Sequence, residues 1–214
     1  MTTTTATATA IEVLSARSDP YAAAPTMLLK LRITRPARVH AMVLKAQIRI
    51  EPQRRRYSPE EEGRLVELFG EAPRWGETLK PFLWTHVSAT VTEFTDQIEV
   101  DLPVPCTYDF EVAAAKYLHG LDDAGEIPLV LLFSGTTFQT DEGRLVVQPI
   151  AWNVEADYRL PVQVWRDIMN AFFPNSGWIR LRRDVIDDLV RFKAEQALTS
   201  WEDTVERLLK EAGR

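Results

Sequence analysis

The sequence contains little of the material from which disulfides and metal sites are built. Cys106 is the only cysteine among 214 residues, so the chain by itself forms no disulfide and no Cys-based structural zinc site. The three histidines, His40, His86 and His119, are dispersed, and none belongs to an H-x-x-x-H pair. We therefore predict no metal centre and no cofactor. The single thiol is expected to be passive and packed, in a reducing compartment such as the cytoplasm.

Long apolar runs are also missing. A membrane-spanning helix needs about 20 consecutive apolar residues. The most apolar stretch, Ile127 to Phe133, has only the length of a strand and contains a proline. Residues 1–10 have no basic residue and no leucine-rich stretch, so they lack the parts of a secretory signal and are expected to be a disordered tail. A cytoplasmic protein without a membrane span is predicted.

Glycines are few and far apart, which argues against phosphate-binding loops. Gly120 and Gly125 have the outer spacing of a Walker loop, but Glu126 and Ile127 follow where that loop needs lysine and serine or threonine. The chain has no G-x-G-x-x-G fingerprint for a dinucleotide, and Ser134 lacks the preceding glycine of a nucleophile elbow. Recognisable nucleotide-binding and serine-hydrolase motifs are thus excluded.

Acidic residues occur in groups, and these are the one source of catalytic chemistry that the sequence leaves open. Glu60 to Glu62 open a predicted helix, where negative charge is favoured. Asp122 and Asp123 lie in a predicted turn, and Asp187 and Asp188 lie on a polar helix face. All three groups have structural explanations. A hydrolase whose two carboxylates meet only after folding stays an alternative.

Period-two alternation dominates the first two-thirds of the chain and predicts half-buried strands. Apolar and polar residues alternate over 29–33 and again over 42–50, and Thr34 to Ala37 is interpreted as a turn that pairs these two strands. Thr95-Asp96 is interpreted as a tight reversal. Further strands are expected at 87–91, 98–102, 110–118, 127–138 and 144–154, with a hairpin turn at Thr140 to Gly143.

Helices are predicted in two regions. Ser58-Pro59-Glu60-Glu61 begins a short helix near 58–70, because serine caps the first turn, proline suits its first position and Glu61 reaches back to the cap. From Pro161 onward the apolar period becomes helical. Further helices are expected from about Arg183 and after Ser200.

The expected fold class is α+β. Seven to nine short strands at this spacing suggest an antiparallel β-sandwich, immunoglobulin-like or C2-like, with a partly open barrel as the alternative. We divide the chain into a tail over residues 1–10, a sandwich over 11–160 that contains the helical insertion near 58–70, and C-terminal helices over 161–214 packed on the sheet.

Charge is distributed unevenly along the chain. Residues 1–57 carry ten Lys and Arg against three Asp and Glu, residues 58–160 carry six against nineteen, and residues 161–214 carry nine of each. Nucleic-acid binding needs a basic face, to which Arg54, Arg55 and Arg56 would contribute. Basic strands often pair beside acidic ones in a sheet, so neutralisation within the chain is favoured and nucleic acid is not an expected partner.

The chain has six tryptophans, a residue enriched at the centres of protein interfaces. Trp165 and Trp201 have helix-core spacing and are expected to pack inside. Trp75, in an irregular connection, and Trp178, just after a Pro-Asn-Ser-Gly turn, are better candidates for exposed anchors. The predicted partner-binding set is Trp75, Trp178, Arg54, Arg55 and Arg56.

Two segments resemble a known family. Phe172 to Leu181, with the later Thr199-Ser200-Trp201-Glu202, resembles the C-terminal part of an uncharacterised bacterial family of unknown function. Ile127-Pro128-Leu129 through Phe138 is similar to that family as well. Because genes of this family are associated with clusters for NiFe uptake hydrogenases, the resemblance implies an accessory role in hydrogenase maturation. It implies no catalytic residues, since none is established for the family.

Three classes of function follow from these observations. The first is a non-catalytic protein-binding or assembly protein, chaperone-like or accessory, which the missing motifs, the charge asymmetry and the tryptophans favour. The second is the two-carboxylate hydrolase. The third is a self-assembling structural subunit in which basic and acidic segments meet between copies. A protein partner is the leading expectation, and a homo-oligomer is compatible with it.

Overall fold

The computed structural model describes residues 8–107, 109, 112–141, 143–174, 176 and 179–213. The chain divides into two compact units, Met1–Gly177 and Trp178–Arg214. We call the first the sheet domain and the second the helix pair, and each is described by itself. Residues 1–7 of the predicted tail lie outside the described residues, and Ala10 already begins the first strand.

The sheet domain is built around one long central strand, β2 (Thr26–Ile50). The first half of β2 pairs with β1 (Ala10–Ser18) and β4 (Phe94–Pro105). The second half pairs with β3 (Phe82–Val91) and β5 (Glu126–Asp141). A strand with partners on both edges along its whole length is shielded from water, so it can form the middle of the core.

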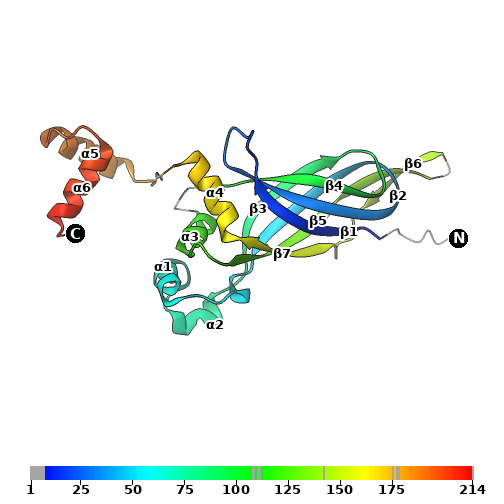
Figure 1. Ribbon diagram of the computed structural model, residues 1–214, viewed down its shortest axis with the longest axis horizontal. Coiled ribbons are helices and arrows are strands. Elements are labelled where there is room, and N and C mark those ends of the chain that lie inside the picture. Colours follow the sequence, from blue (N-terminus) through cyan, green and yellow to red (C-terminus); the bar gives the residue numbers. More distant parts are fainter. Residues whose placement is uncertain are drawn as a thin grey trace. The chain divides into compact units, whose positions relative to one another are not determined.

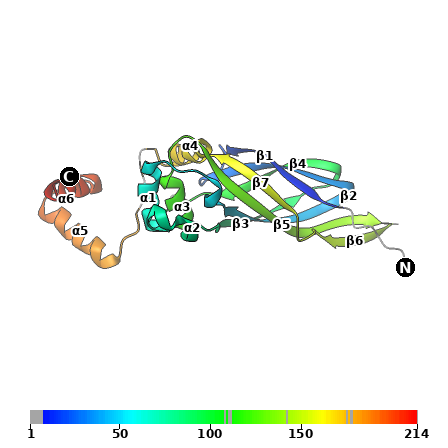
Figure 2. The ribbon, with the colours of Figure 1, turned by 90° about the horizontal axis from the view of Figure 1, so that it is seen from below.

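Two further strands, β6 (Arg144–Pro149) and β7 (Glu155–Pro161), pair with β5. The described strands form one antiparallel sheet of seven strands, which is not closed. The sheet curves so that β7 comes close to β1 (Figures 1 and 2). The expected α+β class, with a large antiparallel sheet and C-terminal helices, is confirmed.

Alternation along β2 explains why this strand occupies the centre. Its inward side chains are buried along the whole strand, whereas its outward side chains include Lys45, Gln47 and Arg49. Full burial of one such apolar side chain contributes about 1.5–3 kcal/mol relative to leaving it exposed. The inward apolar set is Met27, Leu29, Leu31, Ile33, Val39, Met42, Leu44, Ala46, Ile48 and Ile50.

The predicted turn at Thr34 to Ala37 and the predicted reversal at Thr95-Asp96 are both wrong, for one reason. β2 passes through Thr34 to Ala37 as a bulge, and Thr95-Asp96 lies within β4 opposite that bulge, with Asp96 paired to Arg35. Pro36 lacks a backbone N–H, and a bulge accommodates it as well as a turn does. β3 and β4 therefore follow one another along the same edge of β2 instead of forming a hairpin.

The predicted hairpin turn at Thr140 to Gly143 is confirmed, although Glu142 lies outside the described residues. Asp141 of β5 pairs with Arg144 of β6, so the chain reverses over two residues. Gly143 has a φ of +77°, which a residue with a side chain rarely adopts. The turn leads into β6, whose Leu145 and Val147 are exposed.

The strand predicted at 110–118 is wrong where the structure describes it. α3 (Ala113–Gly120) occupies most of that segment, and residues 110 and 111 lie outside the described residues. Consecutive alanines favour a helix over a strand. The buried residues Ala114, Tyr117 and Leu118 have i, i+3, i+4 spacing, so they form one helix face against the core.

Short helices gather at one end of the sheet (Figure 1). α1 (Pro59–Phe69) begins with the predicted capping box: Glu61 N donates to Ser58 Oγ at 3.2 Å, and Ser58 N donates to Glu61 Oε2 at 3.0 Å. The connecting helices are η1 (Pro52–Arg54), η2 (Ala72–Arg74) and α2 (Trp75–Thr78).

α4 (Val162–Phe172) begins one residue after Pro161, where the apolar period becomes helical. Its buried residues Trp165, Ile168 and Met169 lie on one helix face, and the helix packs against β1, β2 and β7. α4 therefore belongs to the sheet domain, and the two compact units divide after it.

The helix pair consists of α5 (Arg183–Glu195) and α6 (Trp201–Glu211). Ser200 caps α6 in a box with Asp203, as predicted. Lys193 Nζ holds the connection by donating to the carbonyl oxygens of Leu198 (3.0 Å) and Thr199 (2.9 Å). Across the described residues, no helix combines the length and the apolar composition that crossing a membrane requires.

Candidate functional site

The helix pair has a very small interior. Val185, Leu189 and Phe192 of α5 are only half-buried, and Thr204 is the one fully buried side chain among the described residues of this unit. A unit of fewer than about 40 residues rarely folds alone without a disulfide, a metal or an oligomeric partner. This unit spans Trp178–Arg214 and has no cysteine, so its apolar side chains need a further surface to pack on.

A second row of apolar side chains follows the half-buried one on both helices. Ile186 and Val190 of α5 are four residues apart, as are Trp201, Val205 and Leu209 of α6, so each row follows one helix face. Ile186 is 40% exposed, and the exposed fractions of the other four are 48–49%. Contiguous exposed apolar rows mark interaction surfaces, unlike single exposed apolar residues. We call these five residues the apolar stripe.

Charged side chains border the apolar stripe. Asp187 and Arg191 follow its residues on α5, and Glu202, Glu206 and Lys210 follow its residues on α6. All five are exposed. An apolar centre with a polar rim is the usual anatomy of a protein interface.

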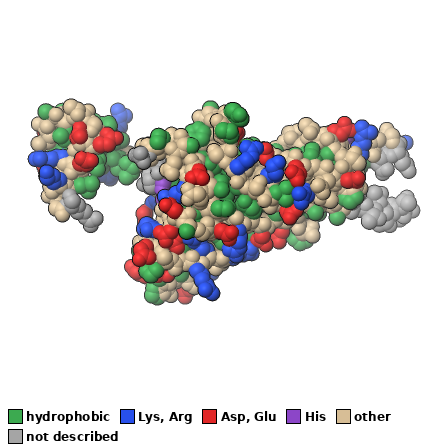
Figure 3. Space-filling view, viewed as in Figure 1, with side chains coloured by type: hydrophobic (Ala, Val, Ile, Leu, Met, Phe, Trp, Pro, Cys, Tyr) green, Lys and Arg blue, Asp and Glu red, His purple; other side chains and the backbone are tan. Residues whose placement is uncertain are grey.

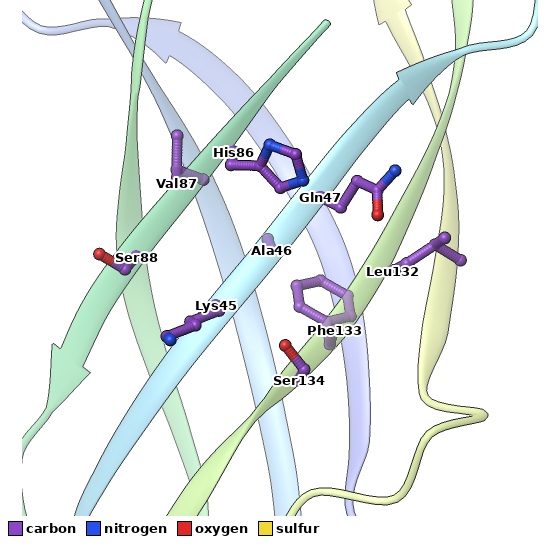
Figure 4. Close-up of a pocket in the computed structure, with 9 residues that line it drawn as sticks. All are labelled: Lys45, Ala46, Gln47, His86, Val87, Ser88, Leu132, Phe133 and Ser134. Carbon is purple, nitrogen blue, oxygen red and sulfur yellow. The ribbon is translucent and has the colours of Figure 1, made fainter. Parts of the chain in front are cut away.

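A hollow of about 420 Å³ lies on the outer face of the sheet, where β3, β2 and β5 run side by side (Figure 4). Lys45 of β2 pairs with Ser88 of β3 and Ser134 of β5, and Gln47 lies beside His86 in the next row. These side chains could donate hydrogen bonds to a polar group of a molecule in the hollow. None of the residues that line the hollow carries a carboxylate, so it has no acid–base pair.

A buried polar cluster ties α1 to the segment between α3 and β5. Glu61 is 3% exposed; its carboxylate pairs with Arg55 and accepts a hydrogen bond from Asp122 N at 2.9 Å. The Arg55 side chain is 9% exposed and also donates to the carbonyl oxygen of Glu126 at 2.8 Å. Both charges are therefore compensated inside the protein, as buried charges must be.

Glu61 and Asp122 are the two carboxylates that folding brings together in this cluster. Arg64 pairs with Asp122, and Ser58 Oγ donates to it at 3.0 Å, and both contacts lower the pKa of Asp122. A general acid needs a raised pKa, so these neighbours have the opposite effect. The contacts describe a structural tie between two segments.

The aromatic cluster beneath α1 contains Trp75. Its ring packs edge-on against Tyr57 (5.1 Å between centroids) and Phe69 (6.1 Å), and its indole N–H donates to the carbonyl oxygen of Gly70 at 2.8 Å. The hydroxyls of Tyr57 and Tyr117 lie 2.8 Å apart, and burial raises the pKa of Tyr117 to about 12. The contacts of Trp75 thus lie within the sheet domain, and its ring is half-buried.

The other predicted partner-binding residues have different surroundings. Arg54 is exposed and pairs with Asp157 at 2.6 Å, whereas Arg55 is committed to the buried ion pair described above. Arg56 is exposed. Trp178 lies outside the described residues, as do Asn175 and Gly177 of the turn before it.

Basic and acidic strands neutralise each other in the sheet domain. Lys30 and Arg32 of β2 pair with Glu99 of β4, and Arg17 of β1 pairs with Asp101 of β4. On the face of this domain that Figure 3 shows, acidic and basic side chains are interspersed. The asymmetry along the sequence is therefore balanced across neighbouring strands, which removes the main argument for a basic nucleic-acid face.

The histidines and the cysteine lie in separate surroundings. His40 donates to or accepts from Thr140 Oγ1 at 2.6 Å, and His86 lines the hollow. His119 packs edge-on against Trp165 at 4.8 Å, and burial with the nearby Arg166 lowers its pKa to about 4. Burial raises the pKa of Cys106 to about 12. In the part of the chain that the structure describes, no three His, Cys, Asp or Glu side chains are grouped as metal ligands.

Sequence reasoning missed the apolar stripe. It assigned Trp201 to packing from its spacing, yet this side chain is 48% exposed. The adjacent pairs Val185-Ile186 and Leu189-Val190 could have predicted it. They make the apolar arc of α5 wider than one neighbouring helix can cover. Trp152, in the turn after β6, was also missed as an exposed side chain and is 93% exposed.

Comparison with known proteins shows a family without an assigned activity. A model described as a family of unknown function, DUF6084, matches residues 6–214. The chain belongs to this family. No curated protein matches it. Among solved structures, 72% of the chain aligns with 15% of a β-glucosidase from Kluyveromyces marxianus at 7% identity and a TM-score of 0.27, which carries no argument about fold or activity.

This DUF6084 member has three features that can be compared as candidate functional sites. The polar cluster around Glu61 has its charges compensated internally, and the hollow around Lys45 is lined by no carboxylate. The apolar stripe differs, since its surface is costly to leave in water. The stripe is therefore the leading candidate for function.

Proposed function

We propose that the chain is a non-catalytic protein-binding and assembly protein whose contact surface is the apolar stripe. The observation that carries the proposal is the row of five half-exposed apolar side chains on a unit with almost no interior of its own. Covering apolar surface contributes about 25 cal/mol per Å². Amphipathic helices commonly bind other proteins through such i, i+4 rows.

The sheet domain supports this function as a stable body that carries the helix pair. Inward residues of its central strands β2 and β5 are buried, and surface charges are paired across neighbouring strands. We further propose that the protein acts in the cytoplasm as an accessory factor in hydrogenase maturation, which the sequence resemblance supports. A two-carboxylate hydrolase has less support, because Glu61 and Asp122 each have an arginine partner.

Site-specific photocrosslinking in cells tests whether the stripe binds protein. A photoreactive amino acid is placed at Val205, in the stripe, or at Val147, on β6, as the matched control. The two valines are 48% and 56% exposed. Protein adducts at 205 well above those at 147 are expected. Equal yields at both positions, or none at 205, would contradict the proposal.

Mass spectrometry of the same adducts addresses the biological setting. Adducts that contain a hydrogenase subunit or maturation protein, at either position, are expected if the accessory role is correct. Adducts formed only with unrelated proteins would remove the hydrogenase setting but would leave the binding function standing.

A further inference from the structure

We infer that the apolar stripe pairs with the same stripe of a second copy of this chain, so that two helix pairs form a four-helix bundle. The inference rests on the proposed function, because it names the protein that the stripe binds. It makes the C-terminal unit a dimerisation module that joins two sheet domains.

The first argument is the permanent need for cover. The helix pair buries only Thr204 completely among its described residues and has no disulfide to hold it. Covering its apolar side chains stabilises a unit of this size. A second copy is present wherever the chain is, and association with it makes the cover of the stripe depend on protein concentration.

The second argument is the charge pattern beside the stripe. On α5 the bordering residues are Asp187 and Arg191, four positions apart, and on α6 they are Glu206 and Lys210, also four apart. When α5 of one copy lies antiparallel to α6 of the other, Asp187 faces Lys210 and Arg191 faces Glu206. The two-fold symmetry of a dimer makes each contact twice. These two contacts are between opposite charges, whereas the same alignment places Glu195 of one copy opposite Glu202 of the other, so the border combines two attractive contacts with one repulsive contact.

The third argument concerns the size of the contact. α5 has 13 residues and α6 has 11. At about 1.5 Å per residue, two such helices present a face roughly 20 Å long and 20 Å wide. This area is smaller than the roughly 800 Å² per partner of a standard stable interface. The contact therefore belongs among the small, transient interfaces, and we expect a reversible monomer–dimer equilibrium.

Sedimentation equilibrium of the full chain over about 1–100 μM tests the inference. Val205→Glu places a charge at the centre of the stripe, and Val147→Glu makes the same change on exposed β6. We expect the chain and Val147→Glu to show the same monomer–dimer equilibrium. Val205→Glu is expected to weaken it by more than about 100-fold, because an unpaired charge would be buried.

A charge exchange tests the alignment itself. Arg191→Glu and Glu206→Arg each create two like-charge contacts in the homodimer and should weaken it about tenfold. In an equimolar mixture of the two variants both contacts between positions 191 and 206 are again between opposite charges, so heterodimers should form with nearly the affinity of the original chain. Arg191 also pairs with Asp188 on its own helix, at 3.0 Å, so circular dichroism of each variant checks that α5 is intact.

The outcomes separate the two proposals. A chain that is monomeric at 100 μM overturns the second-copy inference, as does a dimer that Val205→Glu leaves unchanged. If such a monomer still gives adducts with another protein at position 205, the binding function survives with a different partner. If the monomer gives none, both proposals fail. A mixture of charge variants that does not form heterodimers overturns the α5-to-α6 alignment.

Discussion

Trp165 of α4 and Trp201 of α6 have the same helical apolar spacing, yet one is 1% exposed and the other 48% exposed. α4 lies on a sheet of seven strands, and its packing against β1, β2 and β7 covers Trp165. α6 has one neighbouring helix in its unit, which covers only part of its apolar arc. The same pattern therefore produces a core in one region and a surface in the other, depending on how many layers are available to cover it.

The two regions also differ in how polar groups are used. In the sheet domain, Glu61 and Arg55 are buried and paired, so their loss is expected to affect the whole fold. In the helix pair, the described charged side chains other than Lys193 are exposed, and single ion pairs at exposed positions contribute little. Four changes test this difference, from the largest expected effect to the smallest.

Trp165→Ala and Trp201→Ala compare the two regions directly. Trp165→Ala should lower the free energy of unfolding of the sheet domain by about 3–5 kcal/mol, because it leaves a cavity in a closed core. Trp201→Ala should lower the free energy of unfolding of the helix pair by less than about 1 kcal/mol in dilute solution. Urea unfolding followed by circular dichroism measures both. Equal losses would mean that Trp201 is as well covered as Trp165.

Glu61→Ala should destabilise the sheet domain by about 3 kcal/mol, since it leaves the Arg55 guanidinium buried without its carboxylate. Glu60→Ala, one residue earlier on the exposed face of α1, serves as the control and should change stability by less than about 0.5 kcal/mol. Denaturant midpoints of both variants decide the matter. A loss of similar size in both would indicate that helix charge, not the buried pair, is responsible.

The two capping boxes allow a smaller comparison. Ser58→Ala should cost about 1–2 kcal/mol, because Ser58 caps α1 and also binds Asp122. Ser200→Ala removes only the cap of α6 and should cost about 1 kcal/mol or less, seen as lower helicity of α6. Hydrogen exchange at the first turn of each helix distinguishes these effects. Faster exchange at α1 after Ser200→Ala is not expected.

His119 should give the sheet domain a mild sensitivity to acid. Its pKa is lowered from 6.5 to about 4 by burial and by Arg166, so the unfolded chain binds more protons between these values. Stability is fully present above about pH 6.5 and is lost as the pH falls toward 4. Because His119 is only partly buried, the loss should be on the order of 1 kcal/mol.

Chemical denaturation at pH 7 and pH 5 measures this loss, and His119→Gln should remove most of the difference. The helix pair, Trp178–Arg214, contains no histidine and provides an internal comparison over the same interval. An unchanged pH dependence in His119→Gln would assign the effect to another group.

Strand alternation and helix starts were the parts of the fold that the sequence predicted well. Leu29, Leu31 and Ile33 are inward residues of β2, as their period indicates, and Ser58 and Ser200 cap the helices that their boxes predict. These features depend on neighbours within a few residues, so a local pattern contains the information. The predicted hairpin at Gly143 succeeded for the same reason.

The failures occurred where local chemistry is ambiguous. Pro36 and Asp96 have the properties of turn residues, but Pro36 lies in the bulge of β2, and Asp96 lies in β4 opposite that bulge, paired with Arg35. A bulge and a turn both accommodate a proline, and both accommodate a residue with a positive φ. Only the pairing with a distant strand distinguishes a bulge from a turn. The prediction of the candidate site failed for a similar reason. The spacing identified Trp201 as an apolar position on a helix, but it could not show which surface, if any, covers that side chain.

The sequence by itself determined the periods, the caps, the single thiol and the lack of nucleotide-binding motifs, because each depends on residue identity and short spacing. The tertiary structure alone decided that β2 is one strand with partners on both edges, that Glu61 and Asp122 have arginine partners, and that α5 and α6 leave a row of apolar side chains exposed. Those properties depend on which distant surfaces meet, and burial is a property of the pair of surfaces, not of either segment.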